Sequence, residues 1–96
     1  MESTLAKIKE LADSSDPMGN TLKIKMAEGV IYIDGMGDSN TVHQDDIDAE
    51  CTLVTSLDDF KSLISGSLNP MMAVMTGKLK IEGDMGVAMK LTKILG

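Results

Sequence analysis

His43 and Cys51 are the side chains of this 96-residue chain best suited to acid–base or nucleophilic chemistry, and each is the only residue of its type. A histidine exchanges protons near neutral pH, and a cysteine thiolate attacks electrophiles. A nucleophilic relay also needs an orienting acid, and Ser and Asp are too common here to single one out. Polar residues flank His43, which favours a solvated ring, and Cys51 lies in an apolar alternating segment, where cysteine packs as a small hydrophobe. We therefore expect no catalytic residue.

A cluster of acidic residues precedes Cys51 and could suggest a Ca²⁺ site. Its members are Asp45, Asp46, Asp48 and Glu50. A calcium-binding loop also needs a glycine at its sharp turn and a distant glutamate, and this spacing provides neither. Runs of charge usually face water. The sequence thus predicts a solvated acidic segment, with no metal ligand and no cofactor.

The charge of the chain is unevenly distributed. The net charge is −6 and all nine cations are lysines. Residues 61–96 contain five lysines and two acidic residues, a local charge of +3. The chain has no arginine and only two aromatic side chains, which excludes nucleic acid as a partner. Transient contact with anionic lipid head groups stays open. Lys78, Lys80, Lys90 and Lys93 either meet a ligand carboxylate or phosphate, or simply face water.

Length and composition predict one globular domain over residues 1–96. The chain is 43% hydrophobic and 25% charged, and no apolar run reaches the roughly 18 to 20 residues that a membrane span needs. The segment Met1–Lys9 is amphipathic and mixed in charge, unlike a signal peptide. We therefore expect a cytoplasmic protein.

Apolar periodicity and turn residues predict about five short strands and four helices. The expected strands cover residues 21–26, 30–33, 41–43, 49–55 and 78–82, and the expected helices cover residues 4–13, 57–65, 70–76 and 85–95. Ser56, Asn69 and Asp84 are the expected helix caps. Strands such as 21–26 have one polar face, so all helices should cover the other face. This pattern predicts an α+β two-layer domain.

The last expected helix, residues 85–95, is apolar around more of its circumference than one buried face requires. Its polar residues are Lys90, Thr92 and Lys93, and its apolar arc exceeds the usual width of about 100°. The sheet can cover one side, whereas the other needs a ligand, a membrane or a second chain. The helix before it, residues 70–76, contains three methionines, which either fill the core or line an adaptable apolar surface.

Several motifs in the second half of the chain resemble the sterol carrier protein-2 (SCP-2) lipid-binding domain family. They are Asn69-Pro70 with Ala73, Gly77–Ile81, Gly83–Gly86 and Ala88–Leu91, together with Ala49–Leu53, Asp59-Phe60 and Gly66. The match covers roughly residues 49–91 and is weaker before them. The resemblance implies a largely antiparallel five-stranded sheet, with helices on one face enclosing an apolar tunnel. It also implies binding of fatty acid, fatty acyl-CoA, phospholipid or sterol.

The resemblance places the last helix along the tunnel and so implies a set of lipid-binding residues. They are Phe60, Leu63, Ile64, Met71, Met72, Met75, Met85, Met89 and Leu95. Three alternative functions remain for the chain, depending on what covers the apolar helix. A non-enzymatic lipid carrier is favoured. The same helix could instead form a homodimer or bind a lipid-metabolising enzyme, and an enzyme is the weakest alternative. Methionines suit a flexible chain as well as a rigid ring, so the lipid itself stays open.

Overall fold

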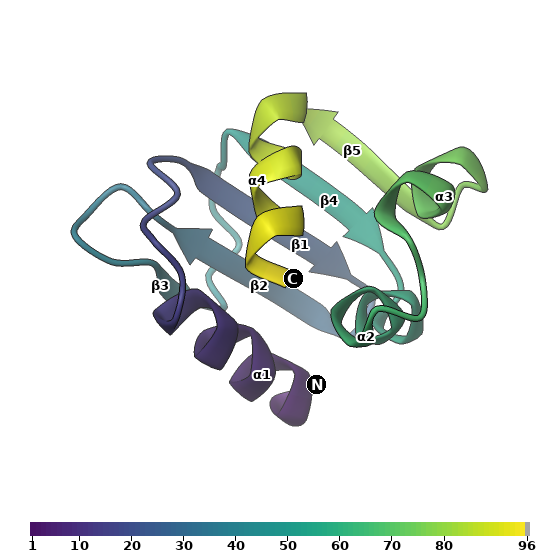
Figure 1. Ribbon diagram of the computed structural model, residues 1–96, viewed down its shortest axis with the longest axis horizontal. Coiled ribbons are helices and arrows are strands. Elements are labelled where there is room, and N and C mark those ends of the chain that lie inside the picture. The colour runs from purple at the N-terminus through teal and green to yellow at the C-terminus, as the bar shows by residue number, and fades with distance from the viewer. Residues whose placement is uncertain (96) are drawn as a thin grey trace.

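The computed structural model describes residues 1–95, in which four helices cover one face of a five-stranded sheet (Figure 1). The helices are α1 (Glu2–Asp13), α2 (Leu57–Ser65), α3 (Pro70–Met75) and α4 (Met85–Leu95). The strands are β1 (Thr21–Met26), β2 (Gly29–Asp34), β3 (Thr41–His43), β4 (Cys51–Thr55) and β5 (Leu79–Gly83). The predicted α+β two-layer architecture is confirmed. None of the helices within residues 1–95 combines the length and the apolar character that spanning a bilayer requires.

The sheet is mixed, with strand order β3-β2-β1-β4-β5. Neighbouring strands are antiparallel except for the central pair β1 and β4, which run parallel. The segment between β3 and β4 therefore has to cross the sheet, and it does so on the face without helices. There Asp46 pairs with Lys23 of β1 at 2.9 Å, and the Tyr32 hydroxyl of β2 donates to the Asp48 carbonyl oxygen at 2.8 Å. The helix-bearing face is left free for the core and the candidate site.

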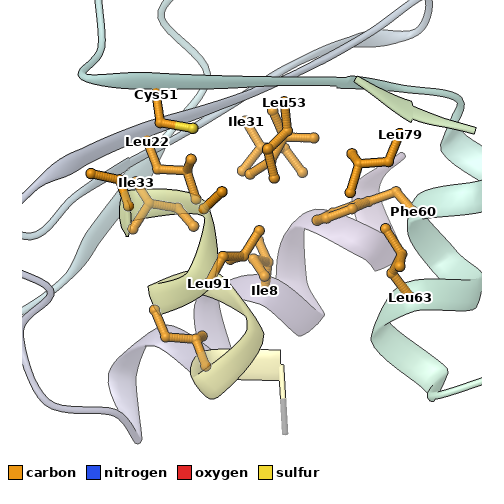
Figure 2. Close-up of a cluster of buried hydrophobic side chains, with 14 of the residues drawn as sticks. Ile8, Leu22, Ile31, Ile33, Cys51, Leu53, Phe60, Leu63, Leu79 and Leu91 are labelled. Carbon is orange, nitrogen blue, oxygen red and sulfur yellow. The ribbon is translucent and has the colours of Figure 1, made fainter. Parts of the chain in front are cut away.

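The core lies between the sheet and the helices, where alternate strand residues point inward. Leu22 and Ile24 of β1 are fully buried, and the strand register places Ile24 between Ile31 of β2 and Leu53 of β4. Figure 2 shows strand residues such as Leu22, Ile31 and Leu53 facing helix residues that include Ile8, Phe60 and Leu91. With so few aromatic residues, the core consists mainly of Ile and Leu.

The three predicted caps are present at the helices that follow β4. Each accepts a hydrogen bond from a backbone N–H in the first helical turn, which otherwise has no partner within its helix. The pairs, acceptor first, are Ser56 with Asp59 (3.0 Å), Asn69 with Met71 (2.8 Å) and Asp84 with Gly86 (2.8 Å). The caps therefore determine where α2, α3 and α4 begin.

Gly83, which joins β5 to α4, lies where its backbone passes close to that of Glu50. Its φ is +98°, and a Cβ atom there would lie 2.5 Å from the Glu50 carbonyl oxygen. Gly77 offers a matched comparison, because its φ is +78° but a Cβ atom would meet nothing within 4 Å. The two glycines thus separate the cost of a left-handed backbone from the cost of a steric clash.

We expect Gly83→Ala to lower the free energy of unfolding by about 2 to 4 kcal/mol, because conformational strain and overpacking add. Gly77→Ala should cost only about 1 kcal/mol, from conformation alone. Urea denaturation of both variants measures the difference. Equal losses would show that the contact with Glu50 does not constrain this position.

Candidate functional site

Helix α4 has two apolar sides in the structure, as its sequence predicted. One side is buried on the sheet and presents Val87, Leu91 and Ile94 to the core. The adjacent side contains Met85 and Met89 and faces a cavity. The surplus of apolar residues is therefore divided between the protein core and an accessible surface.

The cavity is an apolar groove of about 250 Å³ between α3 and α4, and we call it the α3–α4 groove. Its floor consists of strand residues, its walls are the two helices, and α2 contributes one residue. The lining residues are Leu53, Leu63, Pro70, Met71, Val74, Met75, Leu79, Ile81, Met85, Ala88, Met89, Leu91, Thr92 and Leu95. Thr92 is the one polar side chain of this set, and its hydroxyl donates to the Met89 carbonyl oxygen at 2.6 Å. The groove thus offers almost no hydrogen bonding to an occupant.

The α3–α4 groove is open to solvent, where the resemblance implied an enclosed tunnel. Met71, Met75, Met85 and Met89 are 62, 78, 57 and 53% exposed. The reason is the shortness of α3, which has six residues and buries only Ala73. A helix of this length forms one wall of the groove but does not cover it.

Six of the nine residues expected at the site line this groove, namely Leu63, Met71, Met75, Met85, Met89 and Leu95. The other three lie elsewhere. Phe60 is fully buried in the core and Ile64 is partly buried against it. Met72 is exposed outside the groove, because adjacent helical residues point about 100° apart. That the six residues contact lipid stays a prediction.

Sequence reasoning missed the floor of the groove. The alternation of residues 78–82 places Leu79 and Ile81 on the inward face of their strand, but the sequence does not show which helices lie over them. The register places Ile81 beside Leu53 and Leu79 beside Thr55, so these strands run under α3 and α4. The inward alternation was the available signal, and the strand order was the missing information.

His43 and Cys51 lie on opposite faces of the sheet and cannot form a relay. Cys51 is fully buried on the helix-bearing face, where desolvation and, to a lesser degree, the charge of Asp84 raise the pKa of its thiol. The His43 ring stacks on Tyr32 on the other face, with ring centroids 4.7 Å apart. His43 is thus half-buried in β3 and not fully solvated, and its Nδ1 accepts the Asp45 backbone N–H at 3.2 Å.

The acidic cluster stabilises the crossing segment between β3 and β4. The hydrogen bond and charge of Lys23 hold the pKa of the Asp46 carboxyl below its usual range. Glu50 accepts hydrogen bonds from the Asn20 side chain and the Thr21 backbone N–H, both at 3.0 Å. Within residues 1–95, no group of three or more His, Cys, Asp or Glu residues is arranged to hold a metal ion.

The four lysines that could meet a ligand carboxylate or phosphate are divided among different surfaces. Lys90 lies on the side of α4 away from the groove, where its Nζ donates to Asn20 Oδ1 and to the Met18 carbonyl oxygen, the latter at 3.0 Å. Lys80 lies 3.9 Å from Glu82 on the sheet face without helices. Lys78 follows α3, and its backbone N–H donates to the Ala73 carbonyl oxygen at 2.8 Å. Lys93 is exposed one turn after Met89.

A sequence model of the SCP-2 sterol transfer family matches residues 2–96. The chain belongs to this family. It is 38% identical over 96 residues to hydroxysteroid dehydrogenase-like protein 2 of Xenopus tropicalis, covering 97% of this chain and 20% of that protein. It is 41% identical over 58 residues to human sterol carrier protein 2, covering 60% of this chain and 11% of that protein. The chain thus spans a fifth or less of these relatives.

The fold is shared with solved structures of the family. The NMR structure of sterol carrier protein-2 from Aedes aegypti, in complex with palmitate, superimposes with a TM-score of 0.77 at 19% sequence identity. The alignment covers 99% of this chain and 93% of the Aedes aegypti chain. This likeness confirms the arrangement of helices and strands.

We expect Cys51 to resist thiol reagents in the folded protein, because the reactive thiolate is both buried and disfavoured by the raised pKa. Ellman's reagent should modify it only as the protein unfolds in denaturant. Ser39→Cys, at an exposed loop position, provides a control thiol that should react at once in the folded protein. Equally fast modification of Cys51 would contradict its placement in the core.

Proposed function

We propose that this domain binds one acyl chain in the α3–α4 groove and carries lipid without catalysing a reaction. The ligand would be a fatty acid, a fatty acyl-CoA or a phospholipid. The observation that carries the proposal is the second apolar side of α4, which lines a groove with almost no polar atoms. A surface of this kind gains free energy from apolar contact and offers little else to a ligand.

The size of the groove favours a flexible chain over a rigid ring system. Its volume of about 250 Å³ exceeds the cavity of about 150 Å³ that accepts benzene, but falls below the roughly 300 Å³ at which typical small-molecule pockets begin. Four of the lining residues are methionines, whose unbranched side chains adapt to a bent chain. The palmitate complex of the Aedes aegypti protein supports an acyl ligand.

The free energy gained by burying an acyl chain is sufficient for binding, but it does not discriminate strictly between chain lengths. An acyl chain of about 14 methylenes releases roughly 11 kcal/mol on full burial, at about 0.8 kcal/mol per methylene. Lost freedom of the chain offsets a large part of this gain. Because the groove leaves one side of the chain in water, the net affinity is lower still. We infer a carrier that accepts neighbouring chain lengths.

The absence of catalysis is part of the proposal. Its support is that Cys51 is buried on one face of the sheet while His43 is stacked on the other, so neither reaches the groove lining. The activities of the much longer relatives are not transferred to this chain. In a lipid-exchange assay, the wild type and the variants His43→Ala and Cys51→Ala should therefore all leave the lipid chemically unaltered.

We expect Met89→Glu to weaken binding of a fluorescent fatty acid by about tenfold or more, because it puts a charged, hydrated carboxylate in the groove wall that the chain has to cover. Lys93→Glu is the matched control, one turn along α4 and outside the groove lining, and should bind the probe normally. Titration of the delipidated proteins with the probe measures both affinities. Similar affinities for the two variants would refute the groove as the site.

The same variants distinguish a carrier from a dimerisation module. A carrier has the same mass before and after Met89→Glu, and only its ligand binding is lost. A homodimer that buries α4 would dissociate with this substitution and would bind no probe in its wild-type form. Native mass spectrometry before and after delipidation reports both the mass and any lipid that purifies with the protein.

We also expect the affinity for a fatty acid to rise by up to about fourfold for each methylene added to its chain, as long as that methylene contacts the apolar wall of the groove. It should then level off as further methylenes remain in water. Displacement of the probe by saturated fatty acids of increasing length measures this series. Cholesterol should compete less well than palmitate, and stronger competition by cholesterol would overturn the preference for a flexible chain.

A further inference from the structure

The sheet ends at β5, and in the part of the chain that the structure describes this strand has a neighbour on one side only (Figure 1). Its bonds to β4 show which backbone groups are already used. The Asp84 N–H donates to the Glu50 carbonyl oxygen at 3.1 Å, and in an antiparallel pair every second residue bonds to the same neighbour. The N–H and C=O groups of Leu79, Ile81 and Gly83 therefore point away from the sheet. Such an edge is a template for a further strand.

The side chains of β5 have a charge pattern that is complementary to itself when the strand is reversed. Lys78 and Lys80 come before the central residue Ile81, and Glu82 and Asp84 come after it. The side chains of Lys80 and Glu82 are 74 and 54% exposed on the face without helices. Within one chain they lie 3.9 Å apart, and an exposed ion pair of this length contributes little free energy. Both charges are therefore available to a partner.

We propose that β5 pairs antiparallel with β5 of a second copy of this chain, with Ile81 of each copy opposite Ile81 of the other. In this register Lys80 of each copy lies opposite Glu82 of the other, and the two-fold symmetry forms this pair twice. The outward backbone groups of Leu79, Ile81 and Gly83 then exchange about six hydrogen bonds across the two-fold axis. The pairing uses the edge of the sheet and does not depend on the proposed function.

Charge selects this register among those that the backbone allows. A shift by two residues keeps the outward groups facing one another, but it places either Lys80 opposite Lys80 or Glu82 opposite Glu82. Like charges directly opposite one another destabilise a strand pair. A shift by one residue turns the outward groups of one copy toward residues that already bond to β4, so no ladder forms. Lysines at a strand edge usually prevent association, but here the acidic residues after them make one register attractive.

The helices add apolar contact to the strand pairing. Antiparallel pairing about Ile81 keeps the inward residues of both copies on one face, so the two helical layers lie on the same side of a continuous sheet. Helix α3 precedes β5 and α4 follows it, so the two-fold axis brings α3 of one copy toward the first turn of α4 of the other. Met71, Met75 and Met85 are exposed there. A strand edge alone buries less than the roughly 1,200 Å² of a stable interface; with these side chains we expect a dissociation constant in the micromolar range.

Charge reversal on β5 tests the pairing, with sedimentation velocity of the 96-residue chain as the measurement. Lys80→Glu places acidic residues opposite one another at both symmetric positions, and Glu82→Lys does the same with lysines. We expect each variant alone to dimerise at least about tenfold more weakly than the wild type. An equimolar mixture of the two variants should regain the wild-type association, because every position 80 then lies opposite a position 82 of opposite charge.

Lys25→Glu is the matched control, because it changes the net charge as Lys80→Glu does but lies exposed on the central strand β1. It should dimerise as the wild type does. A wild type that stays monomeric up to about 1 mM, or a mixture of the two reversed variants that stays monomeric, would overturn the pairing. So would a dimer that both reversals leave intact and Met89→Glu dissociates, because that dimer would use α4. Loss of fatty-acid binding with an intact β5 dimer would instead overturn the proposed function.

Discussion

The division of α4 between two apolar contacts is the constraint on which the rest of the structure depends. Val87, Leu91 and Ile94 bind the helix to the sheet, while Met85 and Met89 remain at the surface. If α4 were rotated about its axis to bury the methionines, its core residues would become exposed to water or the charge of Lys90 would become buried. A helix with one apolar side would complete the same core and leave no groove.

Polar interactions at two points along α4 hold the helix in this rotation. At its start, Gly83 passes close to the backbone of Glu50, and Asp84 caps the first turn. Further along, Lys90 bonds to Asn20 and to the Met18 backbone just before β1. These contacts involve atoms on the sheet side and on the side away from the groove. The groove wall is therefore positioned without any polar atom entering the groove.

The sequence predicted local structure well because local structure depends on neighbouring residues. The caps Ser56, Asn69 and Asp84 begin helices as expected, and the alternation in residues 21–26 coincides with β1. Strand order and the enclosure of the site depend on contacts between distant residues. The placement of Leu53 beside Ile81, and the position of α3 beside the groove, could not be read from alternation.

The openness of the groove has a consequence for exchange of the ligand. An enclosed tunnel buries the whole chain and gains the full free energy of transfer, but release then requires the protein to open. A chain bound in the α3–α4 groove as proposed would keep one side exposed, so its affinity would be lower and no wall would have to move for its release. Exposed methionines are the structural cost of this arrangement, because side chains that contact the ligand also contact water when it leaves. Under the proposed function, weak selectivity and rapid exchange would have a common origin in the length of α3.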